Sequence, residues 1–112
     1  LQQLEVKMAW VYLLIAGALE VAWATGLKKL GLGFSWTLGG LTLIAMIASL
    51  MALYAAMTRL PIGIAYPIWT GIGSAGSVLI GVMVFNQTIS LPGITGLILI
   101  VAGVFLLGSD AQ

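Results

Sequence analysis

The chain has 112 residues, of which 62% are hydrophobic and 6% charged, with a mean hydropathy of +1.20 and a formal net charge of +1. A soluble domain carries about 25% charged residues, so this chain is too apolar to cover a water-facing surface. It contains no cysteine and no histidine, which argues against disulfides, thiol chemistry and the usual zinc sites. It also lacks a phosphate-binding glycine loop and a basic patch for nucleic acid. These features predict a membrane protein that is neither a conventional enzyme nor a nucleic-acid binder, without metal or cofactor.

Four apolar runs follow one another along the chain, at about residues 8–27, 36–57, 62–85 and 90–107. A helix needs about 20 apolar residues to cross a bilayer, so each run predicts one transmembrane helix. Because the connections are only a few residues long, consecutive helices are expected to be antiparallel neighbours. The predicted fold is an all-α membrane protein with four transmembrane helices per protomer.

The four spans are expected to form one transmembrane domain, residues 8–107. We interpret residues 1–7 as an appended or disordered N-terminal segment, because Met8 directly precedes the first span. Residues 108–112 are expected to be a C-terminal tail. The first apolar run is too long for the core of a signal peptide and is followed by no convincing cleavage site, so we expect it to be a genuine span.

Positive charges are distributed almost evenly between the two sides of the predicted bundle. Lys7 and Arg59 fall on one side, and Lys28 and Lys29 fall on the other. The positive-inside rule counts such residues in short loops, so this balance gives little preference for one orientation. Four thin helices also cannot enclose a wet cavity by themselves. The charge balance thus permits dual topology, although such a chain can still adopt one orientation. An oligomer would enclose the cavity, and dual topology permits an antiparallel pair of the chain with an inverted second copy.

Glu20 is the only acidic residue within the predicted spans. A helix that begins near residue 9 places it roughly 16 Å deep, near the middle of a bilayer about 30 Å thick. Inserting a charge at that depth costs at least ~2.5 kcal/mol of free energy. A residue this unfavourable is expected to serve a specific role. One interpretation is that Glu20 binds protons or cations. The alternative is a structural role, in which Glu20 makes a single hydrogen bond to another helix.

Helical spacing groups further candidates on shared faces. Gly17 and Trp23 lie within one turn of Glu20, where the glycine would leave open volume and the indole would offer a flat face and a donor. Tyr66 and Trp69 stand three residues apart on the third span and could form an aromatic wall for a cation. The alternative for these residues is ordinary helix packing.

The remaining candidates concern the shape of the helices and their seams. Pro67, Gly71 and Gly73 are expected to bend the third span, either as a hinge or as static packing. Ser49 on the second span is more often expected to bond back to its own helix than to form a site. On the fourth span, the residues that mark a close seam between helices, interpreted as the dimer contact, are Gly96 and Gly103.

Three segments carry a resemblance to a known family. They are residues 19–24 (LEVAWA) followed by Leu27-Lys28, residues 60–73 (LPIGIAYPIWTGIG) and residues 96–104 (GLILIVAGV). With these segments the chain resembles the small multidrug resistance transporters over nearly all of residues 8–107. The resemblance implies an antiparallel dual-topology homodimer in the bacterial inner (cytoplasmic) membrane, which exchanges organic cations for protons by alternating access.

Within that family, Trp23, Leu27-Lys28 and the Trp69-Thr70-Gly71 run are similar to the guanidinium-exporter subtype. Carried over by position, the resemblance implies that Glu20 binds either guanidinium or protons. The pocket around it would consist of Gly17, Trp23, Ser49, Tyr66 and Trp69.

The chain also departs from the family's usual pattern. Pro67 stands where alanine is common, Lys29 replaces a usually aromatic or polar neighbour, and residues 86–88 (NQT) with the fourth span look closer to the drug exporters. A polyspecific exporter of quaternary ammonium or lipophilic cations is therefore the alternative within the family. Outside it, the alternatives are a passive cation pore and a structural partner subunit.

Overall fold

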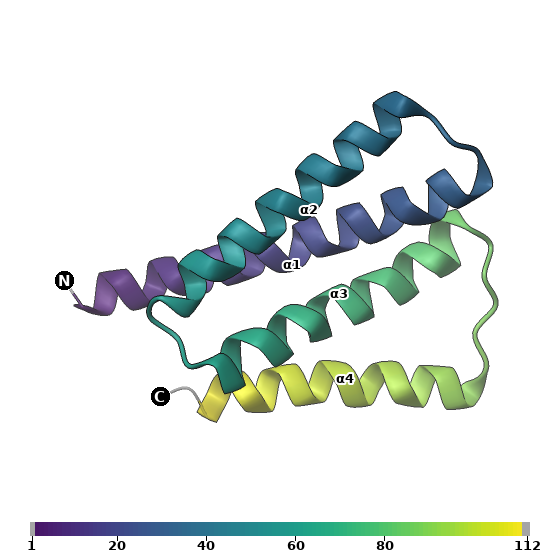
Figure 1. Cartoon of the computed structure of the whole chain (residues 1–112). Helices are drawn as coiled ribbons and strands as arrows, with labels where there is room; N and C mark the ends of the chain where they lie inside the picture. Colours follow the sequence, from purple (N-terminus) through teal and green to yellow (C-terminus); the bar gives the residue numbers. More distant parts are fainter. Residues whose placement is uncertain (1, 111–112) are drawn as a thin grey trace.

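A computed structural model describes residues 2–110, and this part of the chain folds into four α-helices joined by short connections. The helices, drawn in Figure 1, are α1 (Gln2–Leu32), α2 (Trp36–Met57), α3 (Ile62–Val84) and α4 (Leu91–Asp110). Each is long and apolar enough to cross a membrane. The all-α architecture with four potential spans is therefore confirmed.

The ends of α1 and α4 differ from the expected boundaries. α1 begins at Gln2, so it continues through the residues that the sequence set apart before Met8. No proline or glycine interrupts it before Gly17, and Glu5 near its start forms an ion pair with Arg59 at 2.8 Å. Because both partners are about half exposed, this pair is worth only about 0–1 kcal/mol. α4 likewise continues to Asp110, through most of the expected tail, while residues 111–112 lie outside the described residues.

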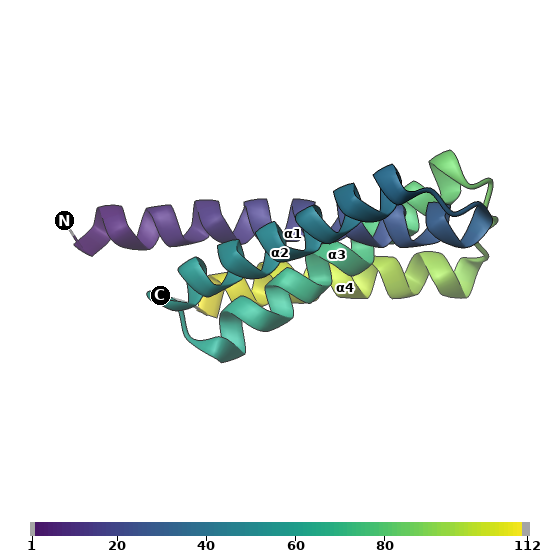
Figure 2. The same cartoon turned by 45° about the horizontal axis from the view of Figure 1, so that its top comes forward.

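The four helices form a flat assembly rather than a closed bundle. α1 packs against both α2 and α3, whereas α4 packs against α3 alone. In Figure 1, α2 and α3 lie on opposite sides of α1, and the turned view in Figure 2 gives a thinner outline. The principal extents are 47 × 37 × 17 Å. The helix α4 contains no buried residue, so most of its surface is available to lipid or to another chain.

A small apolar core holds the first three helices together. Its most deeply buried members are small or aliphatic, namely Leu13, Ala16, Ala56 and Ala65. These side chains come from the first half of α1, the end of α2 and the start of α3. The core therefore lies toward the end of the molecule that carries the α2–α3 connection, and it anchors the site described below.

Two connections are closed by local polar contacts. Ser35 caps α2, because its hydroxyl accepts a hydrogen bond from the Leu38 N–H at 3.3 Å. After α3, Asn86 adopts a left-handed backbone conformation with a φ of 56°, which asparagine tolerates better than most residues. The Gln87 N–H then donates to the Gly81 carbonyl at 2.9 Å. These contacts define the start of α2 and the end of α3, so the connections at these points can be short.

Glycines set the closest approaches between helices, as is usual where helices pack in membranes. A methyl group at Gly26 would overlap Thr42 on α2, and one at Gly71 would lie 2.5 Å from Val104 on α4. Gly96 and Gly103 differ, because no atom lies within 4 Å of a methyl group built at either position. Within the described residues no side chain packs against either glycine, although Gly103 lines a groove between α3 and α4. The role of the two glycines as a dimer contact stays a prediction.

Candidate functional site

Glu20 lies on α1 at the level of the glycines of α3 and is partly exposed. Its carboxylate packs against Gly73, so closely that a methyl group at residue 73 would overlap the carboxylate oxygen Oε1. Among residues 2–110 the one ion pair joins Glu5 to Arg59, so Glu20 has no cationic partner in this part of the chain. Gly73 thus makes room for a carboxylate that no basic side chain of the described residues neutralises.

A polar network joins α1, α2 and α3 one turn before Glu20. The Ser49 hydroxyl donates to the Ala16 carbonyl at 2.7 Å. The indole Nε1 of Trp69 donates to the same carbonyl at 3.2 Å and to the Ser49 hydroxyl at 3.1 Å. Both side chains are buried, at 0% and 7% exposure. In an α-helix the carbonyl of residue 16 also accepts from the N–H of residue 20, so this network fixes the backbone that carries Glu20.

Tyr66 and Trp69 form the aromatic pair that their spacing predicts. Their ring centroids are 5.6 Å apart, and the ring planes are tilted by 52°. Trp69 is held in place by its two hydrogen bonds, while Tyr66 is 49% exposed. The accessible aromatic face of this pair is therefore that of Tyr66, and the buried indole packs beside it.

Trp23 follows Glu20 by one helical turn and has an unusual feature. Its Nε1 atom is buried and has no hydrogen-bond partner among the described residues. Buried donors are rarely left unpaired, and the spacing of three residues places Trp23 within reach of the Glu20 carboxylate. The Trp23 indole thus has an unpaired N–H one helical turn from Glu20.

The role expected for Gly17 needs correction. The glycine does not leave open volume beside the carboxylate, because Ile72 of α3 fills this position. A methyl group at residue 17 would lie 2.6 Å from the Cγ2 atom of Ile72. Gly17 is therefore a packing contact between α1 and α3 in this structure. The sequence showed that a small residue lies near Glu20 but not which side chain takes the space.

The three residues expected to bend α3 lie in one uninterrupted helix. Pro67 is its sixth residue, and the Thr70 hydroxyl lies 3.1 Å from the carbonyls of Tyr66 and Pro67. Gly71 packs against α4 and Gly73 packs against Glu20. Both glycines thus make contacts that larger residues would block, and a hinge at these positions stays a prediction.

Two parts of the site were not found from the sequence. One is the Ala16 carbonyl, because residue types do not show which backbone carbonyl accepts a hydrogen bond from another helix. The other is the direct contact between Gly73 and Glu20, since Gly73 was expected to bend the third span and was not predicted to be a neighbour of Glu20. A glycine on the third span at the depth of a membrane carboxylate was the available signal for that contact.

The geometry can be compared with known proteins. A family model described as "Small Multidrug Resistance protein" matches residues 8–100. The chain belongs to this family. Among its curated relatives is the guanidinium exporter of Yersinia pseudotuberculosis, which is 49% identical over 98 residues, covering 87% of this chain and 93% of the relative. The guanidinium exporter of Salmonella typhimurium is 47% identical over 106 residues, covering 94% of this chain and 100% of the relative. That of Citrobacter freundii is 46% identical over 98 residues, covering 87% and 92%.

Membership of the small multidrug resistance family identifies the chain as a transporter rather than an enzyme. Its four long apolar helices make it a multi-pass membrane protein, and the relatives named above are bacterial. The resemblance drawn from the three sequence segments is thereby confirmed. The polar network and the Glu20 carboxylate lie within these spans.

Proposed function

We propose that the chain exports guanidinium, or small substituted guanidinium cations, in exchange for protons by alternating access. One observation carries the proposal: Glu20, the only acidic residue in the spans, has its carboxylate against Gly73 and is not neutralised by a basic side chain of the described residues. An acidic group at this depth is expensive unless it serves a function. The relatives named as guanidinium exporters support the choice of cation.

Competition for one carboxylate supplies the coupling. A guanidinium is planar and rich in N–H donors, so it forms a forked, charge-assisted pair with a carboxylate. A proton on Glu20 removes the charge and one acceptor, and the two ligands therefore exclude each other. Proton entry down its gradient then displaces the cation, provided that Glu20 faces one side of the membrane at a time.

The surroundings of Glu20 suit a flat cation with many donors. Tyr66, beside the buried Trp69, offers an aromatic face, onto which guanidinium groups stack well. Trp23 has an unpaired N–H that can hold the carboxylate in position. A quaternary ammonium has no N–H and gains only the electrostatic part of this recognition. We therefore expect the site to favour guanidinium over quaternary ammonium cations.

An inverted second copy would complete the site. The assembly is flat, α2 and α3 lie on opposite sides of α1, and Glu20 is partly exposed. An antiparallel homodimer would place two Glu20 side chains in one chamber, and the open Gly96–Gly103 face of α4 offers a seam for such a partner. The even distribution of Lys and Arg permits both orientations in the membrane.

The test is transport by the purified protein in liposomes under an imposed proton gradient. Guanidinium, methylguanidine and tetramethylammonium are compared, and guanidinium is expected to be moved best, with saturation and with counterflow of protons. Glu20→Gln should abolish the exchange. Glu5→Gln is the matched control, because it removes an acidic charge outside the polar network and should leave transport intact. Proton-coupled guanidinium flux that persists in Glu20→Gln would refute the assignment.

A passive pore would give flux that does not saturate and does not depend on the proton gradient. A structural partner subunit would move none of the three cations. Preference for tetramethylammonium in the wild-type protein would instead favour the polyspecific alternative. Each result therefore distinguishes one of the remaining functions from the proposed one.

A further inference from the structure

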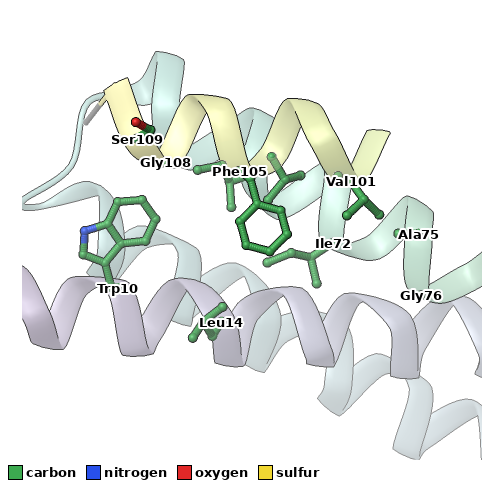
Figure 3. A pocket seen from close by; sticks show the side chains of 12 residues that line it. Trp10, Leu14, Ile72, Ala75, Gly76, Val101, Phe105, Gly108 and Ser109 are labelled. Carbon is green, nitrogen blue, oxygen red and sulfur yellow. The ribbon is translucent and has the colours of Figure 1, made fainter. Parts of the chain in front are cut away.

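An apolar groove lies between α1 and α4, with α3 as its floor. The backbones of α1 and α4 do not pack against each other within residues 2–110. The space between them has a volume of about 740 Å³, and its lining includes Trp10, Leu14, Ile72, Val101 and Phe105. This volume is within the range of small-molecule sites, which is roughly 300–1,000 Å³. Figure 3 shows the side chains of α1 and α4 facing each other across the groove.

The groove is polar at one end only. There the indole of Trp10 on α1 approaches Gly108 on α4, with 3.8 Å between the ring and a methyl group built at the glycine. Ser109 lies at the same end, and in Figure 3 the indole nitrogen points toward this end of the groove. Tryptophan is enriched at the level of the lipid headgroups, where its ring is apolar and its N–H is wet. The remaining lining is hydrocarbon.

The groove and the two open glycines of α4 are on different faces of the helix. At 3.6 residues per turn, Val101 and Phe105 are rotated by about 140° to 180° from Gly96 and Gly103. A second copy docked on the glycine face would therefore leave the groove uncovered. Leu14 and Phe105 are 59% and 74% exposed in the chain, so the groove opens sideways along the helices.

From this arrangement we infer that the groove binds one acyl chain of a phospholipid, whose ester and phosphate oxygens lie at the Trp10–Ser109 end. The shape and polarity match such a ligand, since an apolar channel at bilayer depth ends in two hydrogen-bond donors near the membrane surface. The acyl chain would bridge α1 and α4, whose backbones do not pack against each other within the described residues. This inference does not depend on which cation is transported at Glu20.

The groove also touches the transport site through Ile72. This side chain lines the groove and fills the position above Gly17, one turn from Glu20. An acyl chain in the groove would hold Ile72 against Gly17. Lipid bound there would therefore stabilise the packing of α1 on α3 beside the carboxylate.

Native mass spectrometry of the full chain tests the inference, with palmitoyl-oleoyl phosphatidylethanolamine added to the detergent-purified protein. The wild-type protein is expected to retain the lipid, and Val101→Trp, which fills the groove, should lower retention at least tenfold. Ile98→Trp is the control, because Ile98 is 61% exposed on α4 and does not line the groove. Ala75→Leu fills the groove from α3 and provides a second variant if Val101→Trp does not fold.

Three results would overturn the inference. Equal retention in Val101→Trp and Ile98→Trp would place the lipid elsewhere. Equal retention of dihexanoyl phosphatidylethanolamine, which has the same headgroup on short chains, would show that the acyl chain is not recognised. Loss of dimers in Val101→Trp without any change in retained lipid would make a second copy of the chain the occupant.

Discussion

Replacing Gly73 by alanine tests the contact between α3 and Glu20. A methyl group at this position would overlap the carboxylate, whereas one at Gly63 on the same helix would meet no atom within 4 Å. Alanine is favoured over glycine within a helix by about 1 kcal/mol, which applies to both variants. Moving Glu20 away from a preferred rotamer costs about 0.5–1.5 kcal/mol, which applies only to Gly73→Ala. The two effects nearly cancel, so the stability of Gly73→Ala should remain close to that of the wild type.

Guanidinium binding by Gly73→Ala should change much more than its stability does. The displaced carboxylate would lose its charge-assisted hydrogen bonds to a guanidinium, which are worth about 1.5–3 kcal/mol. Since 1.4 kcal/mol is a factor of ten, the affinity for guanidinium should fall by roughly 10- to 100-fold. Titration calorimetry in detergent measures the affinity, and thermal unfolding measures the stability. If Gly73→Ala binds guanidinium as tightly as Gly63→Ala does, the contact with Gly73 does not position the carboxylate.

Three further predictions concern packing and polar contacts. Ser49→Ala removes one hydrogen bond to α1 and one acceptor of Trp69, and it should lower stability by about 1–3 kcal/mol in thermal unfolding; an unchanged midpoint would mean that the network is dispensable. Gly17→Ala places a methyl group against Ile72 and should cost about 1–3 kcal/mol, whereas Gly40→Ala, with open space around it, should not destabilise. Arg59→Gln breaks an exposed ion pair and should shift stability by less than about 1 kcal/mol. A larger loss would show that the first turns of α1 are held by this pair.

Much of the fold could be predicted from the residues alone. The length and hydropathy of the runs were sufficient for four spans, and helical spacing was sufficient to pair Tyr66 with Trp69. The start of α1 was placed too late, because the polar residues before Met8 are good helix formers and nothing among them ends a helix. The pattern of apolar residues identifies a membrane span, but it does not show how far the helix continues beyond that span.

The site was predicted in part. Residue type alone favoured a bond from Ser49 to its own helix, as Thr25, Ser74 and Ser77 make, and only the family resemblance placed it in the pocket. In the structure it donates to the carbonyl of Ala16 on α1. Which acceptor a hydroxyl chooses depends on how closely a neighbouring helix approaches, and one sequence does not contain that distance. The same limitation applies to Gly17. Its position on the helix face of Glu20 follows from the spacing, but its neighbour Ile72 does not.

The central claim is that Glu20 holds either a proton or a guanidinium ion. Proton release on binding tests it most directly, with guanidinium added to the purified protein in weakly buffered detergent and the pH followed with an indicator dye. The account predicts that guanidinium releases protons from the wild-type protein and from Glu5→Gln, and none from Glu20→Gln. Guanidinium binding to the wild-type protein without proton release, or undiminished release in Glu20→Gln, would contradict it.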